Sequence, residues 1–167
     1  MRLKLIIVAG LPGTGKTFLA RRVAKKLGLP YLGTDQIRRQ MITNPTYNGE
    51  EKNRIYEHLA AATISFLEKG VSCVIDGTFS KKEWRESIML VAKKFEAKVH
   101  VIRVWAEEEV LHQRLHKKRV DSDADYEVHE KLKNESDPWQ QPHLLIQSGA
   151  DSVEVMIGKV MKYLGER

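Results

Sequence analysis

The sequence has 167 residues, 42% of them hydrophobic, and 28 Lys and Arg against 22 Asp and Glu, which gives a formal net charge of +6. This length and hydrophobic content suit one domain over residues 1–167 whose core needs no metal or disulfide. No apolar run reaches membrane-spanning length and the N-terminus lacks a signal h-region, so we expect a cytoplasmic protein with no membrane partner.

The single cysteine, Cys73, lies within the apolar stretch 71–75, so we expect a buried core residue rather than a redox centre or metal ligand. The positive charge favours phosphate-bearing ligands and permits nucleic acid as a partner. Most basic pairs, however, fall on the polar faces of expected helices, where a solvated surface is the commoner explanation.

Apolar runs and amphipathic segments alternate along the chain. The pattern predicts strands at 3–9, 31–32, 71–75, 98–105 and 143–147, and helices at 18–27, 36–42, 50–67, 81–95, 107–117 and 152–164. Residues 118–142 are polar and acidic, and we expect them to form a mobile, lid-like excursion. Strands that alternate with helices predict an α/β fold with a doubly wound parallel sheet, which binds ligands at the carboxyl ends of its strands.

Residues 10–17 carry the strongest motif, Gly-Leu-Pro-Gly-Thr-Gly-Lys-Thr, which fits G-x-x-x-x-G-K-[ST] between an expected strand and an expected helix. In such a loop, backbone amides surround phosphate oxygens. We expect Lys16 to reach the β- and γ-phosphates of ATP and to act in catalysis, and the Thr17 hydroxyl to bind Mg²⁺. The residues expected to bind ATP are Gly10, Gly13, Thr14, Gly15, Lys16 and Thr17.

Asp76 follows the expected strand 71–75, which would place it beside the phosphates. There it would hold Mg²⁺ together with Thr17, directly or through water, because the loop alone supplies too few oxygen ligands. The alternative is an aspartate that accepts turn hydrogen bonds before Gly77.

Asp35 and Arg38 follow the second expected strand, and their spacing places them on one side of a helix. Asp35 would be the base that orients and deprotonates an acceptor hydroxyl, and Arg38 would hold an acceptor phosphate or stabilise the transferring charge. Alternatively, Thr34 or Asp35 caps the helix and Arg38 is its solvated partner.

Arg114 and Arg119 lie where the helix 107–117 enters the polar excursion, together with Lys117 and Lys118. Cations at this point could close over the γ-phosphate and exclude water, so both arginines are candidate catalytic residues. The competing explanation is a solvated basic helix end.

With these motifs, the chain resembles the small P-loop kinases that include polynucleotide 5′-hydroxyl kinases, zeta-toxin-like and chloramphenicol phosphotransferases and gluconate kinase. The resemblance covers nearly the whole length and rests on residues 10–17, 33–38, 74–79, 83–85, 110–119 and 122–125. It implies a three-layer P-loop NTPase fold like that of nucleoside monophosphate kinases, with a five-stranded parallel sheet in the order 2-3-1-4-5 and a short lid.

The resemblance also implies roles for individual residues. In polynucleotide kinases of this group an aspartate and an arginine after the second strand act as base and acceptor-phosphate ligand, which would be Asp35 and Arg38 here. The lid of the group commonly has two arginines four residues apart, whereas here Arg114 is followed at that spacing by Lys118, with Arg119 one residue further on. The turn 148–150 would neighbour the adenine.

The leading hypothesis is an ATP- and Mg²⁺-dependent kinase that phosphorylates a hydroxyl, with the 5′-OH of DNA or RNA as the first acceptor candidate. A kinase for a small molecule, such as a nucleoside, sugar or antibiotic, is the second. A P-loop switch that binds nucleotide without catalysis is the third, but an acceptor-site pair at Asp35 and Arg38 argues against it.

Overall fold

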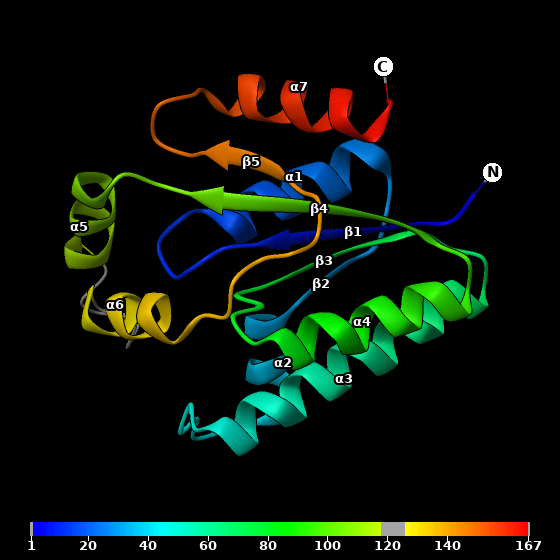
Figure 1. The fold of residues 1–167 in the computed structure, drawn as a ribbon, viewed down its shortest axis with the longest axis horizontal. Coiled ribbons are helices and arrows are strands. Elements are labelled where there is room, and N and C mark those ends of the chain that lie inside the picture. Colours follow the sequence, from blue (N-terminus) through cyan, green and yellow to red (C-terminus); the bar gives the residue numbers. More distant parts are fainter. Residues whose placement is uncertain (1, 118–125, 167) are drawn as a thin grey trace.

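The computed structural model describes residues 2–117 and 126–166. Five parallel strands form one sheet in the order β2-β3-β1-β4-β5, as the resemblance implied (Figure 1). The strands are β1 Lys4–Ala9, β2 Tyr31–Gly33, β3 Cys73–Gly77, β4 Lys98–Trp105 and β5 Leu144–Gln147.

Helices cover both faces of the sheet and complete the three layers (Figure 1). Helices α1 (Lys16–Leu27) and α7 (Val153–Leu164) lie on one face, and α3 (Gly49–Glu68) and α4 (Lys82–Lys94) lie on the other. The side chains of β1 alternate between the two cores: Leu5 and Ile7 pack on the α3 and α4 side, whereas Ile6 and Val8 pack on the α1 and α7 side. A strand covered on both faces needs apolar residues throughout, which explains the continuous apolar run of β1.

The remaining helices lie toward the carboxyl ends of the strands. They are α2 (Thr34–Met41), α5 (Glu108–Lys117) and α6 (Tyr126–Glu135). Helix α2 begins directly after β2, and β3 extends two residues beyond the expected strand, because it pairs with β1 up to the register position Ala9 and Gly77. Asp76 therefore lies within a paired strand and not after it. Within the described residues, no helix is both long and apolar enough to cross a membrane.

Among the described residues, α6 is the helix that the sequence pattern did not predict, since it lies in the excursion 118–142, for which no helix was expected. Its few apolar residues do not give a clear helical stripe, and it contacts both α5 and the P-loop. The Tyr126 ring stacks on the His112 ring at a centroid distance of 3.7 Å, and His129 Nδ1 lies 2.9 Å from the carbonyl oxygen of Pro12. Residues 118–125, which include Arg119, lie outside the described residues, and motion of the excursion stays a prediction.

The chain that returns from α6 is fixed to the loop after β3 by Arg85 of α4, which is only 2% exposed. Its guanidinium donates hydrogen bonds to the carbonyl oxygens of Phe79, Ser80, Asp137 and Pro138, at distances between 2.6 and 3.1 Å. The same guanidinium lies over the ring of Trp139, 4.3 Å from its centroid. One buried cation thus joins the loop after β3 to the segment after α6.

Replacement of Arg85 by Met should destabilise the fold by roughly 3 kcal/mol, because four carbonyl oxygens lose a charged donor and several become buried without a partner. Chemical denaturation measures this free energy. Glu86→Gln is the control, since it removes an exposed ion pair with Lys82 on the same helix and should change stability by less than about 0.5 kcal/mol. Equal stability of Arg85→Met and the wild type would contradict the assigned role.

Candidate active site

The segment between β1 and α1 has the geometry of a phosphate-binding loop. Gly13 and Gly15 adopt positive φ angles of 82° and 87°, which residues with a side chain rarely adopt. They turn the chain into the N-terminus of α1. The Thr14 hydroxyl donates to the Leu11 carbonyl oxygen at 2.8 Å, and the Gly10 amide donates to the Gly77 carbonyl oxygen at 3.3 Å. The loop amides and the helix dipole together favour an anion at this position.

A cleft of about 1450 Å³ opens beside this loop at the carboxyl ends of the strands. One part of its lining comes from the P-loop, the start of α1, α5 and the segment from β5 into α7, and another part comes from α2, the loop before α3, the first turns of α3, the loop after β3 and Trp84 of α4. We call these the nucleotide half and the acceptor half, and two residues of α6, Val128 and Leu132, complete the lining. Of the sequence-predicted site residues, those that line the cleft are Gly13, Gly15, Lys16, Thr17, Asp35, Arg38 and Arg114.

Asp76 is 1% exposed and does not itself line the cleft, but it contacts Thr17, which does. The Thr17 hydroxyl donates to Asp76 Oδ1 at 3.2 Å, and the Tyr31 hydroxyl donates to Asp76 Oδ2. Burial raises the pKa of Asp76 above its ordinary value, and the hydrogen bond from Tyr31 and the positive charge of Lys16 oppose that rise. A hydroxyl and a carboxylate at the end of a phosphate loop are hard oxygen donors, so the residues present fit a Mg²⁺ ion bound together with phosphates.

Asp35 and Arg38 lie on the opposite side of the cleft and contact each other. Arg38 Nη1 donates to Asp35 Oδ1 at 2.8 Å, and the Asp35 side chain is 56% exposed. Arg38 Nε donates to Glu51 Oε1 at 3.2 Å, and the guanidinium lies 5.0 Å from the ring centroid of Tyr47. Two carboxylates therefore share the charge of Arg38.

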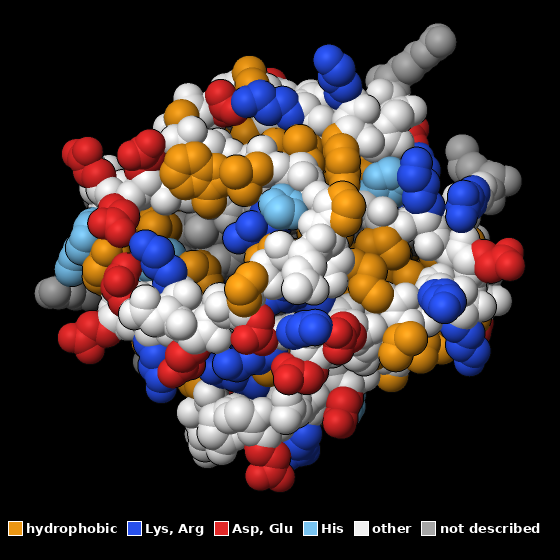
Figure 2. All heavy atoms as spheres, viewed as in Figure 1, with side chains coloured by type: hydrophobic (Ala, Val, Ile, Leu, Met, Phe, Trp, Pro, Cys, Tyr) orange, Lys and Arg blue, Asp and Glu red, His pale blue; other side chains and the backbone are white. Residues whose placement is uncertain are grey.

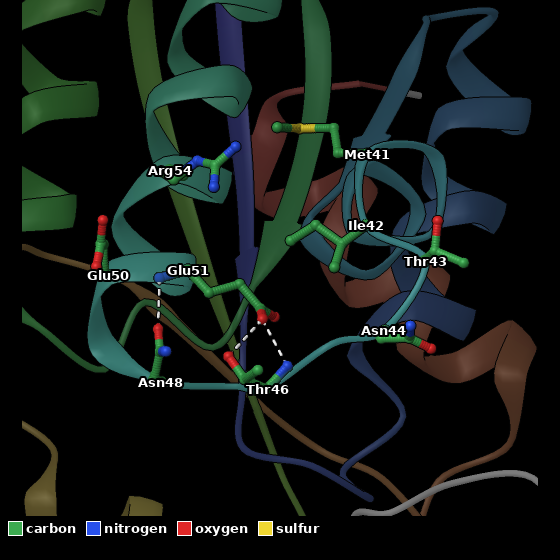
Figure 3. Close-up of a pocket in the computed structure, with 9 residues that line it drawn as sticks. All are labelled: Met41, Ile42, Thr43, Asn44, Thr46, Asn48, Glu50, Glu51 and Arg54. Carbon is green, nitrogen blue, oxygen red and sulfur yellow. Dashed lines mark hydrogen bonds between the residues drawn. The ribbon is translucent and has the colours of Figure 1, made fainter.

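Glu51, which the sequence analysis missed, organises the loop between α2 and α3. It is 7% exposed, and its Oε2 accepts hydrogen bonds from the Thr46 amide at 2.6 Å, the Thr46 hydroxyl at 2.9 Å and the Tyr47 amide at 3.2 Å. In Figure 3 the Glu51 carboxylate points from α3 toward Thr46, beside a small pocket of about 400 Å³. Burial alone would raise the pKa of Glu51, but these hydrogen bonds and the charge of Arg38 outweigh it and leave the pKa below its ordinary value.

A local signal could have identified Glu51. Asn48 caps α3, and its side-chain oxygen accepts from the Glu51 amide at 2.8 Å, so the two residues have the N-cap and N3 spacing of a capping box (Figure 3). In this chain the N3 carboxylate binds the preceding loop and Arg38. The spacing therefore predicts a helix start, whereas the contact with Arg38 depends on tertiary structure.

Arg114 lies on the nucleotide side of the cleft. Its Nη1 donates to the Gly13 carbonyl oxygen at 3.0 Å and to Ser148 Oγ at 2.9 Å, and Ser148 Oγ in turn donates to the Thr14 carbonyl oxygen at 2.6 Å. These bonds join α5, the P-loop and the turn after β5. Contact of Arg114 with a γ-phosphate stays a prediction, and Arg119 lies outside the described residues.

Comparisons with known proteins agree with this fold. Residues 5–138 match the profile of the AAA_33 family, described as an AAA domain. The chain superposes on a sugar kinase from Janibacter sp. HTCC2649 with a TM-score of 0.76 and 19% identity, covering 98% of this chain and 95% of that chain. It superposes on a gluconokinase from Sinorhizobium meliloti 1021 with a TM-score of 0.75 and 13% identity. This superposition covers 99% of this chain and 94% of that chain. At these identities the likeness shows a shared fold.

A sequence relative is much longer than this chain. The uncharacterized protein Mb2027c of Mycobacterium bovis is 25% identical over 159 residues, which cover 87% of this chain and 32% of that protein. The chain thus spans about a third of the length of this curated relative.

Replacement of Asp76 by Asn tests the role of this residue in Mg²⁺ binding separately from its role in stability. Because burial disfavours the charged carboxylate, loss of the charge should change the stability of the nucleotide-free protein by less than about 1 kcal/mol. The same change should remove most of the Mg²⁺-dependent gain in affinity for ATP, since one anionic ligand is lost. Titration of a nonhydrolysable ATP analogue with and without Mg²⁺ measures this gain, and an unchanged gain would exclude Asp76 from the metal site.

Proposed function

Because the chain belongs to the AAA_33 family of P-loop proteins, we propose that it is an ATP-dependent kinase whose acceptor is an alcohol hydroxyl. The observation that carries this proposal is the lining of one cleft by a phosphate-binding loop on one side and by Asp35 on the other. A nucleotide switch without catalysis would have no need of a carboxylate facing the phosphate loop across an open cleft.

The nucleotide half of the cleft would bind and orient the donor. The P-loop amides and Lys16 would hold the β- and γ-phosphates, and the bonds of Arg114 to Gly13 and Ser148 would keep the loop in its binding shape. Thr17 and Asp76 would hold Mg²⁺, which supplies neutralisation of phosphate charge when it is bound.

The acceptor half would position and deprotonate the hydroxyl. Asp35 Oδ1 is held by Arg38, whereas Oδ2 accepts no hydrogen bond within the described part of the chain and is free to accept one from a hydroxyl. The acceptor oxygen would form a bond to the γ-phosphorus as the bond from that phosphorus to the bridging oxygen of ADP breaks, and the hydroxyl proton would move to Asp35. Arg38 would be the residue that fixes the orientation of this base.

Two classes of acceptor fit this site. The sequence favoured the 5′-OH of a polynucleotide, and the sugar kinase and gluconokinase with the same fold support a small polyol about as well. Figure 2 shows Lys and Arg side chains interspersed with Asp and Glu side chains over the visible face. Experiment therefore has to separate the two acceptor classes.

Asp35→Asn tests the proposed base. The variant should bind ATP like the wild type and lose about two or more orders of magnitude in transfer, because the amide cannot accept the proton of the hydroxyl. Lys16→Ala is the companion variant, and it should weaken nucleotide binding and transfer together. Binding is measured by calorimetry, and transfer by labelled ATP with a panel of alcohols. Undiminished transfer by Asp35→Asn would contradict this assignment.

Salt distinguishes the two acceptor classes. For an oligonucleotide acceptor, KM should rise steeply with salt because each neutralised backbone phosphate releases counterions, whereas KM for a small acceptor should change little. Transfer to a 5′-OH oligonucleotide and to a set of sugars and nucleosides is measured over a salt series. Inactivity on every oligonucleotide alongside phosphorylation of a small alcohol would eliminate the polynucleotide acceptor.

A further inference from the structure

The acceptor half of the cleft contains three cationic side chains with different surroundings. Arg38, Arg39 and Lys52 line it together with Asp35 and Tyr47. Arg38 is bound by two carboxylates, so the group formed by Arg38, Asp35 and Glu51 carries a net negative charge. Arg38 by itself is therefore a poor receptor for a further anion.

Lys52, unlike Arg38, contacts no carboxylate in the part of the chain that the structure describes. It lies on the first turns of α3 and is half-buried in the cleft lining. Within the described residues its ammonium group makes no hydrogen bond and no ion pair. A partly desolvated ammonium without a partner is costly, and an anionic ligand would offset that cost.

The charged groups that act on Lys52 belong to the acceptor side. They come from α2 (Arg38), from the residue before α4 (Lys81) and from α6 (Lys131 and Glu135). Burial lowers the pKa of Lys52; the negative charge of Glu135 opposes this shift, and the three cations add to it. Lys52 thus lacks the direct carboxylate contacts that Arg38 makes within the described residues.

From this difference we infer that Lys52 binds an anionic group of the acceptor, a carboxylate or a phosphate, while Asp35 meets the hydroxyl of the same molecule. The inference rests on the proposed kinase function and narrows it to acceptors that carry both a hydroxyl and an anion. Arg39, which is exposed at the same half of the cleft, adds positive charge without a partner of its own among the described residues.

Binding to the protein saturated with Mg²⁺ and a nonhydrolysable ATP analogue tests the site, because the β- and γ-phosphate positions of the P-loop are then filled. The probes are gluconate and thymidine 3′-phosphate, each compared by calorimetry with its uncharged counterpart, glucitol and thymidine. We expect the wild type to prefer at least one anionic member over its counterpart by tenfold or more. Preference for gluconate would indicate a carboxylate metabolite, and preference for thymidine 3′-phosphate would indicate a nucleotide or oligonucleotide end.

Lys52→Met should remove this preference and leave the affinity for the neutral member unchanged, and Lys52→Arg should restore most of it. Arg54→Met is the matched control, because Arg54 is an exposed cation on the same helix that lines the small neighbouring pocket. It should retain the preference. Absence of any anion preference in the wild type, a preserved preference in Lys52→Met or an equal loss in Arg54→Met would each overturn the inference.

Transfer from labelled ATP to the same four compounds separates this inference from the proposed function. Phosphorylation without an anion preference would leave the kinase proposal standing and overturn the role of Lys52. Anion binding that depends on Lys52, without transfer to any compound of this panel or of the wider panel of alcohols, would retain the anion site and contradict the kinase proposal.

Discussion

The buried carboxylate of Asp76 is the charge on which the arrangement of the cleft depends. Parallel pairing places it level with Val8 of β1 on one side and with Gly33 of β2 on the other. The P-loop leaves the sheet just after the first of these positions, and α2 begins just after the second. A single carboxylate thus lies between the segment that would bind the donor and the segment that would bind the acceptor.

Hydrogen-bond donors from two elements hold that carboxylate in place. The Tyr31 hydroxyl reaches it across Gly33, where a Cβ atom would collide with the same hydroxyl. Burial and the charge of Asp76 raise the pKa of Tyr31, so the phenol stays a neutral donor. Thr17 supplies the second hydrogen bond, and burial without these donors would leave an unpaired charge in the core.

In the acceptor half, the charge that has to be held in place is a cation, Arg38, rather than a carboxylate. Glu51 holds both Arg38 and the loop before α3, so the orientation of Arg38 is fixed in the absence of any ligand. A preorganised guanidinium lowers the entropic cost of aligning Asp35. Asp35 and Glu51 compensate the charge of Arg38, whereas Arg39 and Lys52 have no ion-pair partner among the described residues.

The sequence by itself determined the phosphate loop, the α/β class and nearly all of the elements, because each rests on local chemistry: glycine spacing in residues 10–17 and apolar runs that match buried strands. It also placed Asp35 and Arg38 on one face of α2, a matter of three-residue spacing.

Tertiary structure decided which charges meet. The bond between Arg38 and Glu51 spans 13 residues, that between Arg114 and Gly13 spans 101, and that between Ser148 and Thr14 spans 134. Helix α6, whose own apolar pattern is weak, likewise contacts α5 and the P-loop. Such contacts give no periodic pattern in the sequence. They arise because the register of the parallel strands, and the helices packed on them, bring distant segments to one edge of the sheet.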